Sequence, residues 1–353
     1  MTRPGGKNGG GPSHPWVVGV DLGGSNLRVA VYRELGAAAE ACRSSGEPLQ
    51  QEPAAVVRRP VGEDRRVETI VDRIVAAVNE VLGAVGVSRV AVVPVGVGVA
   101  AMLSDRKGTV SNSPHLGWRN VAFGPALAKR LGPARPVGVY NDVNAVAYGE
   151  FGVGAGAGSR DMLCVYIGTG IGGGLVMNGE LIEGATNCAG EIGHVKVTWG
   201  EDAAPCNCGG RGCVEAYVGG SYVQARIRRE LTGGARSLAI DLAGGDAWAV
   251  NPGHVDAAAA EGDPWALTLW TELAPLFAVA LGNAITLVNP DRVVLGGGMF
   301  GRTPTLRDQS LLALSLVTPP ALLDPVDIVM AALGDDAGLV GSALLADAGV
   351  SLI

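Results

Sequence analysis

The chain has 353 residues, of which 48% are hydrophobic and 17% are charged, and its formal net charge is −7. This composition excludes a disordered chain, and the length suffices for two globular domains. No cluster of lysines and arginines stands out in the sequence, which argues against nucleic acid as a partner.

The N-terminal stretch and the cysteines indicate the compartment. Residues 1–15 are rich in glycine and proline and lack an apolar run, so they predict a disordered tail rather than a signal peptide. The longest apolar run, 90–103, is too short to span a membrane. Three of the six cysteines fall within 206–213, which in a reducing compartment favours a metal site over disulfides. We therefore expect a cytoplasmic protein with no membrane partner.

The first predicted element is a hairpin. Residues 16–21 and 29–32 are β-rich runs that enclose the turn L-G-G-S-N-L-R. The turn places Asp21 beside Gly23, Gly24 and Ser25. Glycine turns let backbone N–H groups approach phosphate oxygens, and Asp21 could organise Mg²⁺ through water. A plain hairpin turn fits the same residues.

The next elements alternate between helix and strand. An apolar stripe at helical spacing predicts a helix over 67–85, and the valine-rich run 90–99 predicts a buried strand. Residues 100–113 are expected to form a loop and 123–131 a short helix. A further strand is expected over 137–140.

Asn141 and Asp142 follow that strand directly. Polar groups at the mouth between a strand and a helix are where α/β folds display catalytic side chains. Both residues also suit a helix N-cap, so a structural role is open as well.

A second glycine turn repeats the plan of the first. The run G-T-G-I-G-G-G at 168–174 lies between predicted strands at 162–167 and 175–178. No Gly-Lys-Ser/Thr follows, which excludes a Walker-type loop. The same order of strand, glycine turn and strand thus occurs twice, about 150 residues apart, which indicates duplicated domains that bind one ligand.

The C-terminal part predicts a helix over 222–231, a polar connection over 232–246, and a long helix over 264–287 that tolerates Pro275. A strand over 291–295 ends in a third glycine turn, which suits close approach to a base or ribose. A last helix is expected over 338–348.

The stretch between Glu191 and Glu215 carries four potential metal ligands, namely His194, Cys206, Cys208 and Cys213. Three thiolates and one imidazole, followed by glycines that allow tight turns, suit a closed tetrahedral zinc site. Four protein ligands leave no open position for water, which argues against a zinc hydrolase. The two carboxylates do not suit this site and remain available for a substrate.

Taken together, these motifs resemble the repressor–ORF–kinase (ROK) family. The resemblance rests on D-L-G-G-S at 21–25, N-D-V-N-A at 141–145, I-G-T-G-I-G-G-G at 167–174, A-G-E-I-G-H at 189–194, C-N-C-G-G-R-G-C-V-E at 206–215 and V-L-G-G-G at 294–298. It extends from Val17 to near the C-terminus.

The resemblance implies a two-domain α/β fold of the actin/hexokinase (ribonuclease H-like) type with a cleft between the domains. Residues 16–139 would form the small N-terminal domain, with the helix at about 338–353 packed back on it. Residues 140–337 would form the large domain, including the zinc-binding loop 191–215. The resemblance also implies a homodimer.

The implied activity is ATP-dependent phosphorylation of a hexose such as glucose, at the 6-position by default, with Mg²⁺ accompanying ATP and structural Zn²⁺. Asp142 would be the general base. The implied sugar ligands are Asn141, Glu191, His194 and Glu215; the implied ATP and phosphate ligands are Asp21, Gly23, Gly24, Ser25, Gly168, Thr169, Gly170, Gly172, Gly297 and Gly298; and the implied zinc ligands are His194, Cys206, Cys208 and Cys213.

Two departures from the family pattern bear on the acceptor. A Pro-Gly pair that is common after the buried strand is replaced by Ala100 and Ala101, and an Asn that contacts sugar hydroxyls is replaced by His115. Imidazole differs from a carboxamide in size, donor pattern and charge. His115 and Ala101 are therefore candidate substrate contacts. An amino sugar (3-amino-3-deoxyglucose or an N-acylhexosamine) or a C7-cyclitol is an alternative acceptor, and a loop histidine without a ligand is the other interpretation.

A non-catalytic sugar-binding regulator is the competing class. Family repressors carry a helix-turn-helix segment before the first glycine turn, whereas the twenty residues before Asp21 are rich in glycine and proline. A regulator would also be expected to lose Asp142 or the phosphate glycines, which this chain retains. The sequence thus favours a kinase.

Overall fold

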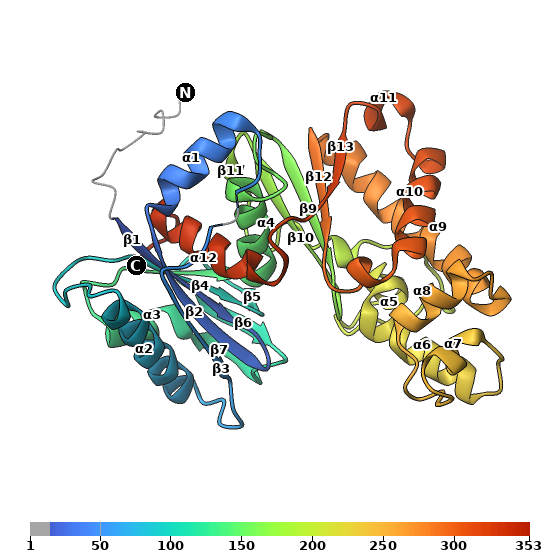
Figure 1. The fold of residues 1–353 in the computed structure, drawn as a ribbon, viewed down its shortest axis with the longest axis horizontal. Helices are drawn as coiled ribbons and strands as arrows, with labels where there is room; N and C mark the ends of the chain where they lie inside the picture. The colour runs from blue at the N-terminus through green and yellow to red at the C-terminus, as the bar shows by residue number, and fades with distance from the viewer. Residues whose placement is uncertain (1–14, 50) are drawn as a thin grey trace. The chain divides into compact units, whose positions relative to one another are not determined.

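The computed structural model describes residues 15–49 and 51–353, which form two compact units. The first unit takes the described residues of Met1–Ser45 and Leu49–Val153 together with Gly338–Ile353, and the second takes Gly46–Pro48 and Gly154–Ala337 (Figure 1). The expected disordered tail lies outside the described residues, except for Pro15.

The first unit is built on a five-stranded mixed sheet with the order β3-β2-β1-β4-β8. β1 pairs antiparallel with β2 and parallel with β4, and β4 pairs parallel with β8. The strands are β1 (Trp16–Leu22), β2 (Asn26–Arg33), β3 (Ala55–Pro60), β4 (Val95–Val99) and β8 (Val137–Asn141). The predicted first hairpin is confirmed.

Helices cover both faces of this sheet (Figure 1). α2 (Val67–Ala84) and α3 (Phe123–Leu131) pack on one face, and α1 (Leu35–Ser45), α4 (Asp142–Val153) and α12 (Ala337–Asp347) pack on the other. A Cβ atom added to Gly19 or Gly96 would lie 2.1 or 1.8 Å from the carbonyl oxygen of Leu339 or Ser342. Glycines in β1 and β4 therefore let α12 approach the sheet closely.

The boundary between the units differs from the one expected at 139/140. The first unit continues to Val153, because β8 pairs along β4 and α4 packs on β4 and α1. Asn141 and Asp142 consequently belong to the first unit.

Two local predictions in this unit were wrong. The expected loop 100–113 contains β5 (Met102–Leu103) and β6 (Thr109–Ser113), which form a small antiparallel sheet with β7 (Trp118–Ala122). The strand expected from residue 90 begins at Val95. Val90 is 85% exposed and proline at 94 has no N–H to donate, so residues 90–94 cannot serve as a buried strand.

The second unit has its own five-stranded sheet with the order β11-β10-β9-β12-β13. Its strands are β9 (Met162–Ile167), β10 (Ile171–Met177), β11 (Glu180–Leu181), β12 (Arg292–Gly296) and β13 (Asp327–Met330). Because β10 begins at Ile171, the turn after β9 is shorter than the predicted 168–174. Gly172 is paired with Tyr166 inside the sheet rather than lying in the turn.

The helices of the second unit pack around α9 (Pro264–Val288), which contains Pro275 as predicted. The others are α5 (Glu215–Val218), α6 (Gly220–Thr232), α7 (Leu238–Leu242), α8 (Pro252–Ala260), α10 (Pro304–Val317) and α11 (Pro320–Leu323), with short 3₁₀ turns η1 (Ile192–His194), η2 (Phe300–Arg302) and η3 (Gly334–Asp336). α7 lies within the expected polar connection.

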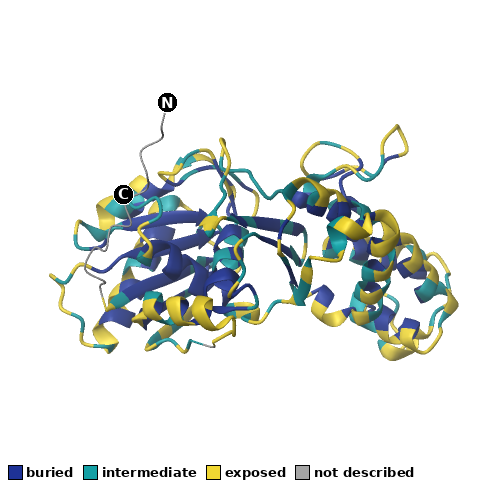
Figure 2. Ribbon diagram, turned by 90° about the horizontal axis from the view of Figure 1, so that it is seen from above, coloured by how far each residue is buried: buried dark blue, intermediate teal, exposed yellow. Residues whose placement is uncertain are grey.

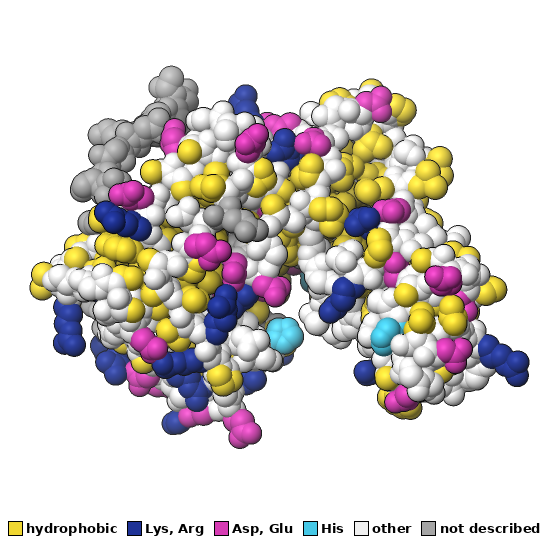
Figure 3. Space-filling view, viewed as in Figure 1, with side chains coloured by type: hydrophobic (Ala, Val, Ile, Leu, Met, Phe, Trp, Pro, Cys, Tyr) yellow, Lys and Arg dark blue, Asp and Glu magenta, His cyan; other side chains and the backbone are white. Residues whose placement is uncertain are grey.

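α9 is long and apolar enough to cross a membrane by length and composition alone. Its side chains Trp270 and Phe277 are buried in the hydrophobic core of the second unit, which accounts for that composition. Strands are largely buried and exposed residues gather on the outer sides of the helices (Figure 2). On the face drawn in Figure 3, basic and acidic side chains are interspersed, unlike the single-sign basic patch that binds nucleic acid.

Candidate active site

The first glycine turn joins β1 to β2 and places Asp21 beside a guanidinium. The backbone N–H of Gly23 donates to the carbonyl of Asn26 at 3.0 Å and closes the turn. Asp21 and Arg28 are paired across the two strands, and Arg28 Nε donates to Asp21 Oδ2 at 2.9 Å. The carboxylate is therefore held at the root of the turn by a charged hydrogen bond.

His115 lies against the same turn. A Cβ atom added to Gly24 would lie 3.0 Å from the Cβ of His115 and 3.5 Å from its Nδ1. Arg65 Nη1 donates to the carbonyl of His115, and Trp118 Nε1 donates to the carbonyl of Arg65 at 2.7 Å. The hydrogen bond from Arg65 thus holds the backbone that presents this imidazole, and the structure brings His115 to the candidate phosphate turn.

Asn141 and Asp142 stand at the junction of β8 and α4. Asn141 Oδ1 accepts from the N–H groups of Val143 (2.9 Å) and Asn144 (3.1 Å), and its Nδ2 donates to the carbonyl of Ala101 at 3.1 Å. The side chain of Asn141 therefore caps the helix. Asp142 Oδ1 accepts from the N–H of Val143 at 3.0 Å. Ala101 is buried, and its carbonyl anchors Asn141.

The second glycine turn, residues 168–170, joins β9 to β10 in the second unit. It is closed by a hydrogen bond from the N–H of Gly168 to the carbonyl of Gly170 at 3.0 Å. The third turn lies beside it, since the N–H of Met299 donates to the carbonyl of Ile167 at 3.0 Å. Gly297 has φ +94°, and a Cβ there would lie 2.3 Å from the carbonyl oxygen of Ile167. Two predicted nucleotide-binding turns are thus adjacent at the end of β9.

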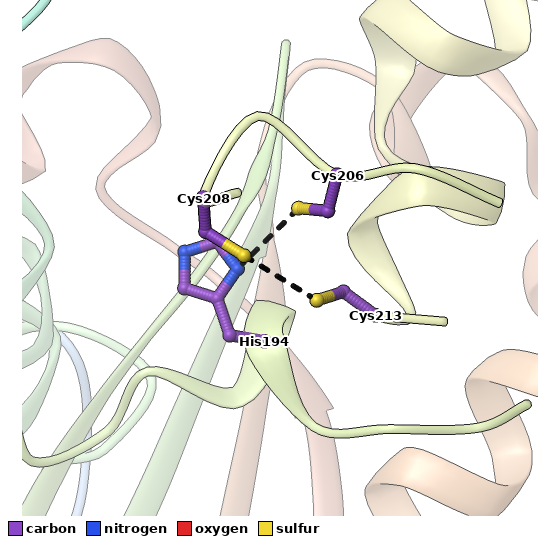
Figure 4. A group of neighbouring side chains, drawn as sticks. All are labelled: His194, Cys206, Cys208 and Cys213. Atoms are coloured by element: carbon purple, nitrogen blue, oxygen red, sulfur yellow. Dashed lines mark hydrogen bonds between the residues drawn. The ribbon is translucent and has the colours of Figure 1, made fainter. Parts of the chain in front are cut away.

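The four predicted metal ligands form one cluster (Figure 4). Their ligand atoms all lie within 4.8 Å of one another. Cys206 Sγ is 3.8 Å from His194 Nδ1, and Cys208 Sγ is 3.6 Å from Cys213 Sγ. Tetrahedral zinc with bonds of about 2.0–2.3 Å separates its ligand atoms by about 3.3–3.8 Å. The donor set therefore suits zinc, and the two separations of 3.8 and 3.6 Å lie within this range.

The protonation of Cys206 depends on whether a cation is bound. Burial raises the pKa of the Cys206 thiol to about 12. A buried thiol of this kind becomes a thiolate at neutral pH when a cation compensates its charge. Without a cation, burial therefore holds Cys206 as the neutral thiol, and a bound metal would displace its proton.

The two carboxylates flank the cluster on different sides. Glu191 Oε2 is 3.9 Å from His194 Nε2, so the imidazole turns one nitrogen to the cysteines and the other to this carboxylate. Burial raises the pKa of the Glu191 carboxyl; the positive charge of His194 opposes this, and the negative charge of Glu215 adds to it. Glu215 Oε2 accepts from the N–H of Ile171 at 2.8 Å, and Oε1 is 3.9 Å from Cys206 Sγ.

Two residues that contact the candidate site, one at the cysteine cluster and one at the glycine turn, were not predicted. Lys196 Nζ donates to Cys213 Sγ at 2.8 Å, and Ser221 Oγ donates to the carbonyl of Thr169 at 2.8 Å. Lys196 follows His194 by only two positions, and this proximity in sequence is a signal that could have placed it near the metal ligands. Nothing in the sequence marks Ser221.

The predicted residues divide between the units. The first unit holds Asp21, Gly23, Gly24, Ser25, Ala101, His115, Asn141 and Asp142, and the second holds Gly168, Thr169, Gly170, Gly172, Glu191, His194, Cys206, Cys208, Cys213, Glu215, Gly297 and Gly298. In the first unit Asp21 and Asn141 lie in the last two residues of β1 and β8, and in the second unit the turn at 168–170 follows β9 directly, positions where α/β folds place their sites.

Comparison with known proteins agrees with this arrangement. Residues 17–348 match the ROK family. A glucokinase of Streptomyces coelicolor is 31% identical over 94% of this chain and 97% of its own length. The crystal structure of a ROK family glucokinase from Streptomyces griseus, in complex with glucose and AMPPNP, has a TM-score of 0.72 and 29% identity, and covers 95% of this chain and 100% of its own. A xylose repressor of Caldicellulosiruptor bescii is 24% identical over 79% of this chain and 65% of its own length.

The chain therefore belongs to the ROK family, and within it to the ATP-dependent carbohydrate kinases. Its two α/β units, each built on a five-stranded mixed sheet, have the fold of that family's hexokinase-like members.

Proposed function

We propose that the protein transfers the γ-phosphate of ATP to a hydroxyl, at the 6-position, of a hexose or hexose-like acceptor such as glucose. The observation that carries this proposal lies in the second unit. There Glu215 contacts the glycine turn at 168–170 through the N–H of Ile171 and also lies beside Cys206 of the candidate metal cluster. Glu215 therefore connects a glycine turn suited to bind phosphate with a group of carboxylate and imidazole side chains suited to bind sugar hydroxyls.

Phosphoryl transfer requires in-line positioning and charge neutralisation more than covalent chemistry. Backbone N–H groups of the glycine turns would hold the phosphates, and Mg²⁺ bound with ATP offsets their charge. Asp142 would accept the proton of the attacking hydroxyl as the new P–O bond forms. Its position at the N-terminus of α4 is fixed because Asn141 caps the helix next to it.

The sugar would be held by carboxylates and amides. Glu191 and Glu215 would accept hydrogen bonds from neighbouring hydroxyls, and His194 Nε2 would donate to another. Asn141 keeps a second N–H for this purpose, since only one is needed for the carbonyl of Ala101.

His194, Cys206, Cys208 and Cys213 would hold zinc, which fixes the loop and the tautomer of His194 rather than acting as a Lewis acid. Nδ1 faces Cys206 and Nε2 faces Glu191, which is the division that such a role requires. The reduced thiols of this site are consistent with the cytoplasm. We also expect a homodimer.

One observation favours the alternative acceptor, an amino sugar or a C7-cyclitol. The imidazole of His115 packs on Gly24, where a plain hexokinase-type loop would present a carboxamide. A neutral imidazole offers one donor and one acceptor, and an imidazolium offers two donors. Either form therefore distinguishes an amine from a hydroxyl in a different way than a carboxamide does.

The deciding experiment measures ATP-dependent ADP formation with glucose, glucosamine, 3-amino-3-deoxyglucose, N-acetylhexosamines and C7-cyclitols, followed by mass analysis of the product. Stoichiometric formation of a sugar phosphate from one acceptor would support the kinase and identify its class. Sugar binding without ADP formation for any of these acceptors would instead indicate a non-catalytic sugar-binding regulator.

A further inference from the structure

The glycine turn at 168–170 rests on the corner between α5 and α6. The N–H of Gly220 donates to the carbonyl of Gly168 at 3.0 Å, and the N–H of Ser221 donates to the carbonyl of Thr169 at 2.9 Å. Ser221 Oγ donates to the same carbonyl of Thr169 at 2.8 Å. Three hydrogen bonds therefore pull two successive carbonyls of the turn toward this corner.

This arrangement orients the N–H groups of the turn. In a trans peptide the C=O and the following N–H point in opposite directions. Because the carbonyls of Gly168 and Thr169 face the corner, the N–H groups of Thr169 and Gly170 face away from it. They are the donors that a phosphate would meet on the open side of the turn.

The next N–H of the turn is bound differently. Ile171 donates to Glu215 Oε2 at 2.8 Å, and a Cβ added to Gly170 would lie 2.4 Å from the same oxygen. The carboxylate thus touches the turn itself, and its contact with Ile171 fixes where the turn ends and β10 begins. Glu215 is the first residue of α5, and the glycines at 219 and 220 let the corner approach this closely.

We infer that Glu215 is a positioning residue for the nucleotide's phosphate groups, in addition to the role in sugar binding proposed above. It holds Ile171 so that Thr169 and Gly170 present their N–H groups to the phosphate. This inference rests on the proposed kinase function, because it assigns a nucleotide to the turn at 168–170.

The charge of Glu215 and its contact with the turn have opposite expected effects on nucleotide affinity. A carboxylate beside a phosphate site repels the phosphate, so removing its charge should tighten nucleotide binding if charge were its whole effect. If Glu215 positions the turn, removing its acceptor oxygen should weaken binding, while an uncharged acceptor should preserve it. A backbone hydrogen bond to a charged group is worth about 1.5–3 kcal/mol, or roughly a 10- to 100-fold change in affinity.

The test measures the affinity of the full-length protein for Mg²⁺–AMPPNP by calorimetry, without sugar. Glu215→Ala should bind at least about tenfold more weakly than the wild type. Glu215→Gln retains a carbonyl oxygen for Ile171 and should bind within about threefold of the wild type or more tightly. Glu215→Asp is one methylene shorter, so it keeps the charge but should lose the contact with Ile171 and bind Mg²⁺–AMPPNP weakly. It replaces the alanine variant in the test if that variant does not fold.

Glu191→Gln is the matched control, because Glu191 is the other candidate sugar carboxylate and its contact is to His194 rather than to the glycine turn. It should keep the wild-type affinity for AMPPNP and lose affinity for the sugar. Wild-type affinity in both Glu215→Ala and Glu215→Asp, or tighter binding in Glu215→Ala, would overturn the inference. Failure of the wild type itself to bind Mg²⁺–AMPPNP would count against the proposed function, which is a different result.

Discussion

Lys196 places its ammonium nitrogen 2.8 Å from the Sγ of Cys213, and the two residues face each other across an isolated antiparallel bridge. The hydrogen bond to Cys213 raises the pKa of the Lys196 side chain. Three thiolates and a neutral imidazole on Zn²⁺ carry a net charge of −1. A nearby ammonium offsets this charge, so Lys196 should help to retain the metal.

Replacing Lys196 by Met should therefore make the metal easier to remove. Loss of a hydrogen-bonding partner around a metal site typically costs 10- to 100-fold in affinity, and for an exposed lysine we expect the lower end, about tenfold. The rate of zinc transfer to a chromogenic chelator measures the effect. Lys129→Met, on α3 of the first unit, is the control and should release zinc at the wild-type rate. If both variants released zinc at the same rate, Lys196 would have no role in retaining the metal.

Cys208→Ser should abolish zinc retention, because a serine hydroxyl is a poor zinc ligand and the remaining three residues leave the site open. Zinc content by elemental analysis should fall from about one per chain to near zero. The KM for the sugar should rise, since the loop that carries His194 loses its anchor. Cys188→Ser is the matched control, as Cys188 donates to the carbonyl of Thr186 outside the cluster. Unchanged sugar KM in metal-free protein would contradict the loop-holding role.

Asp142→Asn should lower kcat by about 10²–10⁴-fold, the usual contribution of a general base. The fold should be retained because Asn141 supplies the cap of α4. The measurement is a coupled assay of ADP formation, accompanied by the melting temperature and the zinc content. Near-normal turnover with normal folding would exclude Asp142 as the base.

His115→Asn should shift the acceptor preference toward hexoses that carry hydroxyls only. A change of hydrogen-bonding partner at a substrate group is worth about 1–3 kcal/mol, so we expect a roughly 5- to 150-fold change in the ratio of kcat/KM between the amino or cyclitol acceptor and glucose. The affinity for Mg²⁺–AMPPNP serves as the control and should change little. If the ratio stays constant, His115 is a loop residue without a role in specificity.

The sequence predicted well those features that depend on local rules. The hairpin at Asp21 follows from β-rich runs around a glycine turn, and the helix Phe123–Leu131 was predicted with its observed bounds. The proximity of His194 to the three cysteines follows from the short loops that join them, and the structure brings all four together; their binding of zinc stays a prediction.

Features that depend on distant pairing were missed. The strand Thr109–Ser113 is short and polar, and it exists because it pairs with neighbours on both sides. Gly172 reads as a turn residue in the run of glycines, yet pairing with Tyr166 places it in a strand. The contact between Ile171 and Glu215 joins residues 44 positions apart. Neither residue type signals such a backbone contact, so only the folded chain reveals it.

Asp263 offers a test of how α9 is stabilised. Burial raises the pKa of its carboxyl, but hydrogen bonds from the N–H groups of Ala266 and Leu238 (both 2.8 Å) and from the hydroxyl of Ser237 (3.0 Å) outweigh burial and lower the pKa. A carboxyl whose pKa is lower in the folded state than in the unfolded state stabilises the fold above its unfolded pKa, about 3.9. That stabilisation is lost as the pH falls through the folded pKa.

Asp263→Asn keeps an oxygen acceptor for the N–H of Ala266 but removes the charge and the second oxygen, which accepts from the N–H of Leu238. The variant should be less stable than the wild type by roughly 1 kcal/mol at pH 7, and the difference should shrink below about pH 4 as the wild-type carboxyl becomes protonated. Melting temperatures at pH 7, 5, 4 and 3 measure this convergence. Asp263→Ala removes the cap itself and should stay less stable at every pH. A gap between the wild type and Asp263→Asn that persists unchanged at pH 3 would show that the charge of Asp263 is not what stabilises the start of α9.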